Sequence, residues 1–143
     1  MSSTPAGTPP RTLPGLDRQN RAYWTGGAEG RLMIGRCSAC RTFIHPPMPR
    51  CPACGDRRVE AEAVSGRGRI ASYSVNHQAW LPGLAVPYVF AAVELEEQGQ
   101  LYVFTNIVNT PAENVEIGLP VEVVFEQHED VHLPMFQSRG GAQ

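Results

Sequence analysis

Four cysteines carry the strongest chemical signal in the sequence. Cys37 and Cys40 are separated by two residues, ten residues follow, and Cys51 and Cys54 repeat the spacing with Gly55 directly after them. A two-residue spacing lets one tight turn present two sulfurs to an ion, and two such turns complete a tetrahedral set of thiolates. The doubled spacing favours a metal site over a redox dithiol or a disulfide. We expect zinc rather than iron, because zinc carries no oxidation liability in air.

This metal is expected to be structural. Four sulfurs saturate the ion, so no position stays open for water or substrate. The segment 37–58 is dense in cysteine and proline and shows no periodicity. Because such a segment is too small to form its own core, metal binding is expected to supply its folding energy.

The four histidines are the remaining candidates for acid or base chemistry. His45, within Phe-Ile-His-Pro-Pro, is interpreted as a surface or packing residue. His77 follows an expected strand in a loop, where contact with a ligand or partner is more common. His128 and His132 flank Glu129-Asp130 and are expected to cap a solvated turn. The sequence has no Gly-x-Ser-x-Gly elbow, no phosphate-binding glycine loop with lysine and no further cysteine, so we predict no catalytic residue.

Three aromatic residues fall outside the strand alternation: Tyr23, Trp24 and Trp80. Aromatic side chains near prolines on loops are enriched where protein partners dock. These residues are therefore candidate anchors of a partner interface. The alternative, that the two tryptophans simply cover the ends of a barrel, stays open.

Charge is divided unevenly along the chain. Residues 1–70 carry eleven arginines and five acids, a net +6, whereas residues 71–143 carry one arginine and nine acids, a net −8. The basic part could neutralise the acidic part or meet a phosphate-bearing ligand. All twelve basic residues are arginine, so a Schiff-base mechanism that depends on lysine is excluded for this chain.

The elements that position these residues follow from composition and periodicity. Residues 1–15 are rich in Pro, Ser, Thr and Gly and are expected to form a disordered tail. A lead-in of helix and strand is expected over 16–36, with a short amphipathic helix capped by Asp17 and ended by Gly26-Gly27. The metal segment 37–58, a barrel over 59–137 and a tail over 138–143 complete the chain.

The barrel is predicted from alternation with a period of two. One long first strand is expected from Val59 to Val75, broken by a glycine bulge at 65–68. A turn at 110–114, with Thr110 as cap, is expected before the fourth strand. The later strands are predicted at 88–95, 101–108, 121–127 and 131–136. This mainly β set matches a five-stranded antiparallel OB barrel.

The order of these motifs resembles the family catalogued as domain of unknown function thirty-five, over residues 16–137. The resemblance rests on the following segments: Gly30-Arg31-Leu32, Cys37-x-x-Cys40, Phe43 to Pro47, Cys51-Pro-x-Cys54-Gly55, Ser65 to Gly68, Pro87-Tyr88-Val89, Glu94-Leu95, Ile117 to Val121, and Leu133-Pro134-x-Phe136. The sequence departs from the family pattern at His45 and Arg69.

The resemblance implies a rubredoxin-like zinc ribbon followed by an acyl-CoA-associated OB-fold. Members of the family typically accompany thiolase-superfamily enzymes that act on acyl-CoA, often as an obligate small subunit. The stretch Asn76 to Gly83 looks like the branch that partners thiolase-like aldolases of steroid side-chain breakdown. The resemblance therefore implies a noncatalytic subunit of a hetero-oligomer, with acyl-CoA contact open.

Two other functions stay open at this point. OB barrels and zinc ribbons also bind single-stranded nucleic acid, but the acidic barrel half opposes phosphate binding. A free-standing acyl-CoA-binding protein or thioesterase is the third hypothesis. The N-terminus has no basic region followed by an apolar one, so a cytoplasmic location is expected, and no stretch approaches the length of a membrane span.

Overall fold

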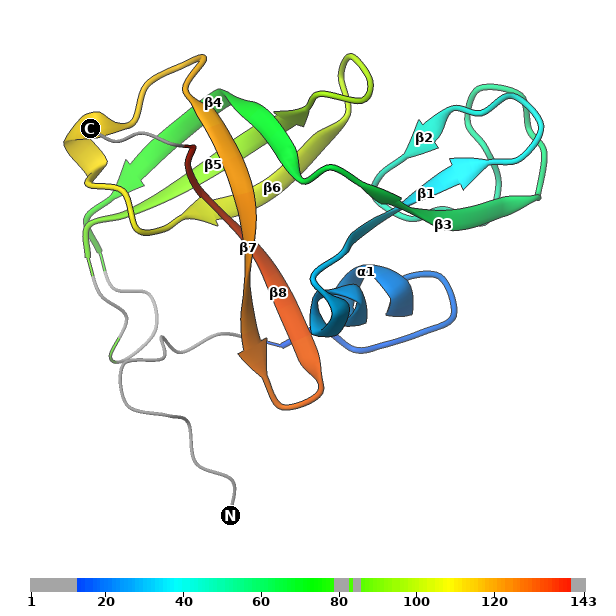
Figure 1. Ribbon diagram of the computed structural model, residues 1–143, viewed down its shortest axis with the longest axis horizontal. Helices are drawn as coiled ribbons and strands as arrows, with labels where there is room; N and C mark the ends of the chain where they lie inside the picture. The colour runs from blue at the N-terminus through cyan, green and yellow to red at the C-terminus, as the bar shows by residue number, and fades with distance from the viewer. Residues whose placement is uncertain (1–12, 79–82, 84–85, 140–143) are drawn as a thin grey trace.

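The computed structural model describes residues 13–78, 83 and 86–139 (Figure 1). No helix in these ranges is long and apolar enough to cross a membrane. The elements in chain order are α1 (Arg21–Thr25), the 3₁₀ turn η1 (Gly26–Glu29), β1 (Leu32–Cys37), β2 (Phe43–Ile44), β3 (Val59–Val64), β4 (Arg67–Asn76), β5 (Tyr88–Leu95), β6 (Tyr102–Ile107), the 3₁₀ turn η2 (Ala112–Asn114), β7 (Pro120–His128) and β8 (Val131–Ser138).

The strands form two sheets. Five strands close into a barrel in the order β4-β5-β6-β8-β7, and three form a small antiparallel sheet in the order β2-β1-β3. The barrel pairs are antiparallel except for the short parallel contact of β6 with β8 at Ile107 and Phe136. The predicted mainly β fold with a five-stranded OB barrel is thus confirmed. Strand alternation also located each of the last four barrel strands.

The first barrel strand differs from the prediction. Residues Val59–Val64 pair along their whole length with β1, from Cys37↔Val59 to Leu32↔Val64, so β3 belongs to the three-stranded sheet. The glycine segment is the place where the chain leaves this sheet and enters the barrel, as Figure 1 shows. The register shift lies further along, between Ile70 and Ser72. Alternation continues across the change of sheet, which is why it predicted one strand.

Two glycines are needed at this crossing. Gly66 has φ +80°, in the left-handed region, and a Cβ there would lie 2.4 Å from Val123 Cγ1. A Cβ on Gly68 would lie 2.4 Å from the carbonyl oxygen of Glu94 on β5. The close approach of backbone at Gly68 lets β4 pair with both β5 and β7.

The helical lead-in is shorter than predicted. Asp17 does cap, because its Oδ1 accepts hydrogen bonds from the backbone N–H groups of Gln19 and Asn20, but it caps the turn before α1. The glycines at 26 and 27 continue the chain as η1, which ends at Gly30 with φ +72°. Leu13, which the sequence assigned to the tail, packs against the apolar cluster under β8.

One apolar cluster joins the barrel to the lead-in. The barrel contributes residues such as Val93, Val103 and Phe136, and the front of the chain contributes Tyr23 and Leu32 to the same cluster. The zinc-ribbon sheet extends away from the barrel, with α1 beside its base (Figure 1). The cysteine end of this sheet has its own small cluster, formed by Cys37, Ile44 and Cys51 with Val59 against it.

Candidate metal centre and surrounding site

Two similar turns position the four cysteines. Arg41 N–H donates to the carbonyl of Cys37 at 2.9 Å, and Gly55 N–H donates to the carbonyl of Cys51 at 2.8 Å. Both donors have positive φ, +67° at Arg41 and +83° at Gly55. The glycine after the second pair therefore serves the turn, and an arginine accepts the same strained conformation in the first turn.

The sulfur positions fit a tetrahedral metal. Cys37 Sγ lies 3.6 Å from Cys54 Sγ, and Cys40 Sγ lies 3.6 Å from Cys51 Sγ. All four sulfurs lie within 4.8 Å of one another. A zinc ion with Zn–S bonds of about 2.3 Å requires sulfurs about 3.8 Å apart. The residues therefore fit structural zinc.

Hydrogen-bonding groups lie next to three of the four sulfurs. The backbone N–H groups of Cys40 and Ala53 donate to the sulfurs of Cys37 and Cys51, respectively. The Thr42 hydroxyl lies 3.2 Å from Cys40 Sγ, and hydrogen bonding to Thr42 lowers the pKa of Cys40 to about 6. Cys37 and Cys51 are buried while Cys40 and Cys54 are exposed, so the centre lies at the surface with its inner half in the apolar cluster.

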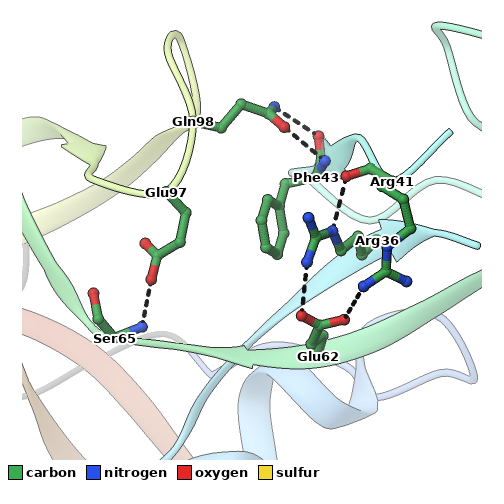
Figure 2. A network of polar contacts seen from close by, with 7 residues as sticks. All are labelled: Arg36, Arg41, Phe43, Glu62, Ser65, Glu97 and Gln98. Carbon is green, nitrogen blue, oxygen red and sulfur yellow. Dashed lines mark hydrogen bonds and ion pairs between the residues drawn. The ribbon is translucent and has the colours of Figure 1, made fainter.

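A polar connection holds the ribbon against the barrel (Figure 2). The Gln98 side chain, from the turn between β5 and β6, accepts a hydrogen bond from Phe43 N–H at 2.8 Å and donates one to the Phe43 carbonyl at 3.1 Å. Next to it, Glu97 accepts a hydrogen bond from the N–H of Ser65 at 2.7 Å. The amide of Gln98 thus pairs with β2 much as a neighbouring strand would.

Ion pairs and a cation–π contact stabilise the same part of the ribbon. Arg36 forms an ion pair with Glu62 at 2.8 Å, and its guanidinium lies 4.2 Å from the centre of the Phe43 ring. Arg41 also reaches Glu62, at 3.4 Å (Figure 2). Sequence reasoning missed this network, because Gln98 and Phe43 are 55 residues apart and no spacing in the sequence connects them.

His45 is a packing residue, as predicted. Its ring lies 4.7 Å from the ring of Tyr23, and burial lowers the pKa of His45 to about 4. Its Nδ1 is buried without a hydrogen-bond partner among the described residues. The imidazole is therefore neutral at pH 7.

The other three histidines lie in two places, one after β4 and two in the β7–β8 hairpin. His77 is exposed just after β4. His128 and His132 do flank the β7–β8 turn, but they are not solvated caps. His128 Nε2 is 2.8 Å from Glu126 Oε1 with 9% of its side chain exposed, and His132 packs close to Gly27. His77 thus lies in a different element from the two histidines of the β7–β8 hairpin.

The two aromatic candidates that the structure describes differ in how deeply they are buried. Tyr23 is 6% exposed and part of the main cluster, and burial raises its pKa. It is therefore a core residue, and its prediction as an exposed anchor is wrong. Trp24 is half-buried, touches both the main cluster and the cluster under β8, and meets Tyr23 edge to face at 4.7 Å. Trp80 lies outside the described residues.

Comparison with known families agrees with this architecture. Residues 24–60 match the family described as "ChsH2, rubredoxin-like zinc ribbon domain", and residues 61–126 match "ChsH2, C-terminal OB-fold domain". The boundary between them, at residues 60 and 61, falls inside β3. The class of protein is thus a zinc ribbon fused to an OB-fold.

The chain belongs to the DUF35 family. A "DUF35 domain-containing scaffold protein" of Methanocaldococcus jannaschii is 38% identical, over 73% of this chain and 74% of the relative. The "3-oxo-4,17-pregnadiene-20-carboxyl-CoA hydratase alpha subunit" of Mycobacterium tuberculosis is 32% identical over 92% of this chain. The chain spans about two fifths of the length of the hydratase alpha subunits it matches.

A solved structure is also similar. It is described as "Ltp2-ChsH2(DUF35) aldolase", has 38% sequence identity and a TM-score of 0.76, and aligns with 88% of this chain and 98% of the solved chain. This chain therefore shares its fold with a DUF35 protein that is described together with a second protein, Ltp2.

Proposed function

We propose that this chain is a noncatalytic subunit that binds and supports a thiolase-superfamily enzyme acting on acyl-CoA. The observation that carries the proposal is the similarity to the DUF35 chain of the aldolase structure over nearly its whole length. The names of the hydratase and scaffold relatives also describe subunits or scaffolds. The proposal assigns catalysis to the partner and structural support to this chain.

The chemistry of the described residues supports this division. The four thiolates leave zinc no open position, so the metal would stabilise the ribbon rather than activate water. His45 and His128 are packed against other side chains, and His77 is exposed just after β4. None of these positions forms a nucleophile–base pair with another described residue.

We further propose that the complex is a retro-aldol carbon–carbon lyase of steroid side-chain degradation in the cytoplasm. The resemblance of residues 76–83 to the aldolase-associated branch supports this reaction. The word "aldolase" in the description of the similar structure and the steroid substrate in the name of the mycobacterial relative point the same way. Whether this chain contacts the acyl-CoA is left to experiment.

Activity measurements on separate and mixed proteins test the proposal. Thiolase-like proteins from the same genome are purified alone and after co-expression with this chain, and cleavage of a steroid side-chain acyl-CoA is followed. We expect turnover only from the complex. A robust rate from this chain alone, surviving further purification, would contradict the proposal and support a free-standing thioesterase, for which His77→Ala would be the first variant.

A further inference from the structure

An apolar groove lies on the barrel, away from the zinc site. Its volume is about 400 Å³, and we call it the aromatic groove. Its walls come from the outer face of β5 and β6, from β8, from α1 and from the chain before it. The lining residues are Leu13, Pro14, Tyr23, Trp24, Phe90, Phe104, Thr105, Asn106, Leu133, Pro134 and Met135.

Two phenylalanines form the exposed edge of this groove. Phe90 on β5 is 48% exposed and Phe104 on β6 is 66% exposed, and their rings stack at 6.1 Å with an interplanar angle of 5°. Their outward position follows from the pairing, since Val89, Ala91 and Val103 face the core. Exposed, stacked phenylalanines beside an apolar groove are candidates for a binding surface.

The lining of the aromatic groove is uncharged. Two other cavities of similar size in the described part of the chain include charged side chains: Arg18 beside α1, and Arg69, Glu94, Glu96 and Arg139 at the start of β4. A ligand of the aromatic groove therefore meets apolar surface with a few neutral polar groups, as in the core of a protein interface.

The same face of an OB barrel can bind single-stranded nucleic acid by stacking bases on aromatic rings. Such binding also requires cations along the strand path, because phosphate neutralisation supplies most of the affinity. Among the described residues, the lining of the aromatic groove includes no cation, and the second half of the chain carries a net charge of −8. The charge pattern thus favours a protein over a nucleic acid.

We infer that the aromatic groove is the docking site for an uncharged, apolar segment of the thiolase-like subunit, with Phe90 and Phe104 as anchors. This inference rests on the proposed function. About half of the Phe90 side chain and two thirds of the Phe104 side chain are exposed. At roughly 200 Å² for a whole side chain, the pair presents roughly 230 Å² of aromatic surface. A stable interface buries about 800 Å² per partner, so the pair would form its centre and the groove walls its surroundings.

Binding measurements on matched variants test the inference. Phe104→Thr and Phe90→Thr remove the rings and keep β-branched side chains suited to strands. Ile117→Thr is the control, because Ile117 is 62% exposed but lies outside the aromatic groove. The affinity for a thiolase-like subunit that co-purifies with the wild-type chain is measured by calorimetry. We expect each phenylalanine variant to bind about 30-fold more weakly, with unchanged zinc content, and the control to bind normally.

The wild-type chain provides an independent measurement. Amide hydrogen exchange in residues 102–106 is expected to slow when the thiolase-like subunit binds. Equal affinity of Phe104→Thr and wild type, or unchanged exchange there, overturns the groove assignment and leaves the proposed function intact. Absence of any complex with wild type overturns both. A homodimer that Phe104→Thr dissociates, or binding of oligothymidine lost in that variant, identifies a different occupant and also overturns the inference.

Discussion

The ribbon and the barrel bury their interiors by different means. Under the metal centre, the buried cluster consists of Cys37, Ile44 and Cys51, so two of its three members are ligands. The barrel cluster is built from apolar side chains of every strand, with Phe136 fully buried. A cluster as small as that of the ribbon cannot offset the loss of chain entropy, so metal binding must contribute the difference. The comparison predicts that the cysteine end of the ribbon depends on its metal, whereas the barrel is stable through its apolar core.

Loss of a ligand is expected to have the largest effect, and only on the ribbon. Cys51→Ser removes one of two buried thiolates, and the binding energy at stake is on the order of 10 kcal/mol. Elemental analysis should show loss of zinc, while circular dichroism should keep the barrel signal. Full zinc retention in this variant would contradict the four-thiolate site.

The second prediction concerns a cavity made in the barrel, which should destabilise the barrel and leave the zinc site of the ribbon intact. Phe136→Ala removes a fully buried ring where β8 meets β6, which is expected to lower the free energy of unfolding by about 3–5 kcal/mol. Chemical denaturation measures this loss. Zinc content should stay at one per chain under native conditions, because the ligands lie in the ribbon turns. Loss of zinc together with barrel stability would show that the two regions fold as one unit.

The hydrogen bonds that connect the ribbon to the barrel are expected to contribute less to stability than the barrel core. Gln98→Ala removes both hydrogen bonds to Phe43 and leaves its N–H and carbonyl without these partners, at a cost of about 1–3 kcal/mol. Thermal unfolding and amide exchange at Phe43 report the change. Gln127→Ala is the control, since that side chain makes an exposed contact within its own hairpin turn. Equal exchange at Phe43 in both variants would show that the connection contributes nothing.

The smallest expected effect depends on pH and concerns the contact of His45 with Tyr23. Burial lowers the pKa of His45 from 6.5 to about 4 in the folded chain, so below pH 6.5 the unfolded chain binds the proton more readily. Stability contributed by the neutral ring is therefore present above pH 6.5 and lost as the pH falls toward 4, by about 1 kcal/mol at pH 5.5. Denaturation at pH 7.5 and 5.5 measures it.

His45→Phe supplies the control for that measurement. The phenyl ring can pack on Tyr23 but does not titrate, so the difference between wild type and variant isolates the histidine from other acid effects. An identical loss of stability in both proteins between pH 7.5 and 5.5 would assign the pH dependence to other groups.

Local patterns predicted the elements that depend on local chemistry. The cysteine spacing predicted four sulfurs that share one ion, and they lie within 4.8 Å of one another. The run of strand-favouring residues from Tyr88 to Leu95 located β5 at its observed bounds. Pairing partners were not predictable in the same way. β3 continues the alternation toward β4 yet pairs with β1, because Gly66 and Gly68 let the chain change sheets.

The burial and the surface contacts of single residues could be determined only from the fold. Tyr23 is buried because α1 packs against the cluster that joins lead-in and barrel, which no spacing in the sequence indicates. Phe90 and Phe104 were assigned to strands, and only the pairing of β5 with β6 brings their rings together on the outer face. The contact of Gln98 with Phe43 likewise depends on how the ribbon lies against the barrel.

Hydrogen exchange on the wild-type chain before and after zinc removal tests the difference between the regions most directly. The account predicts one zinc per chain and, after chelation, fast exchange of amides in β1 to β3 while amides in β5 to β8 stay protected. Equal protection of β1 to β3 with and without zinc would contradict it, because the ribbon would then be stable without its metal.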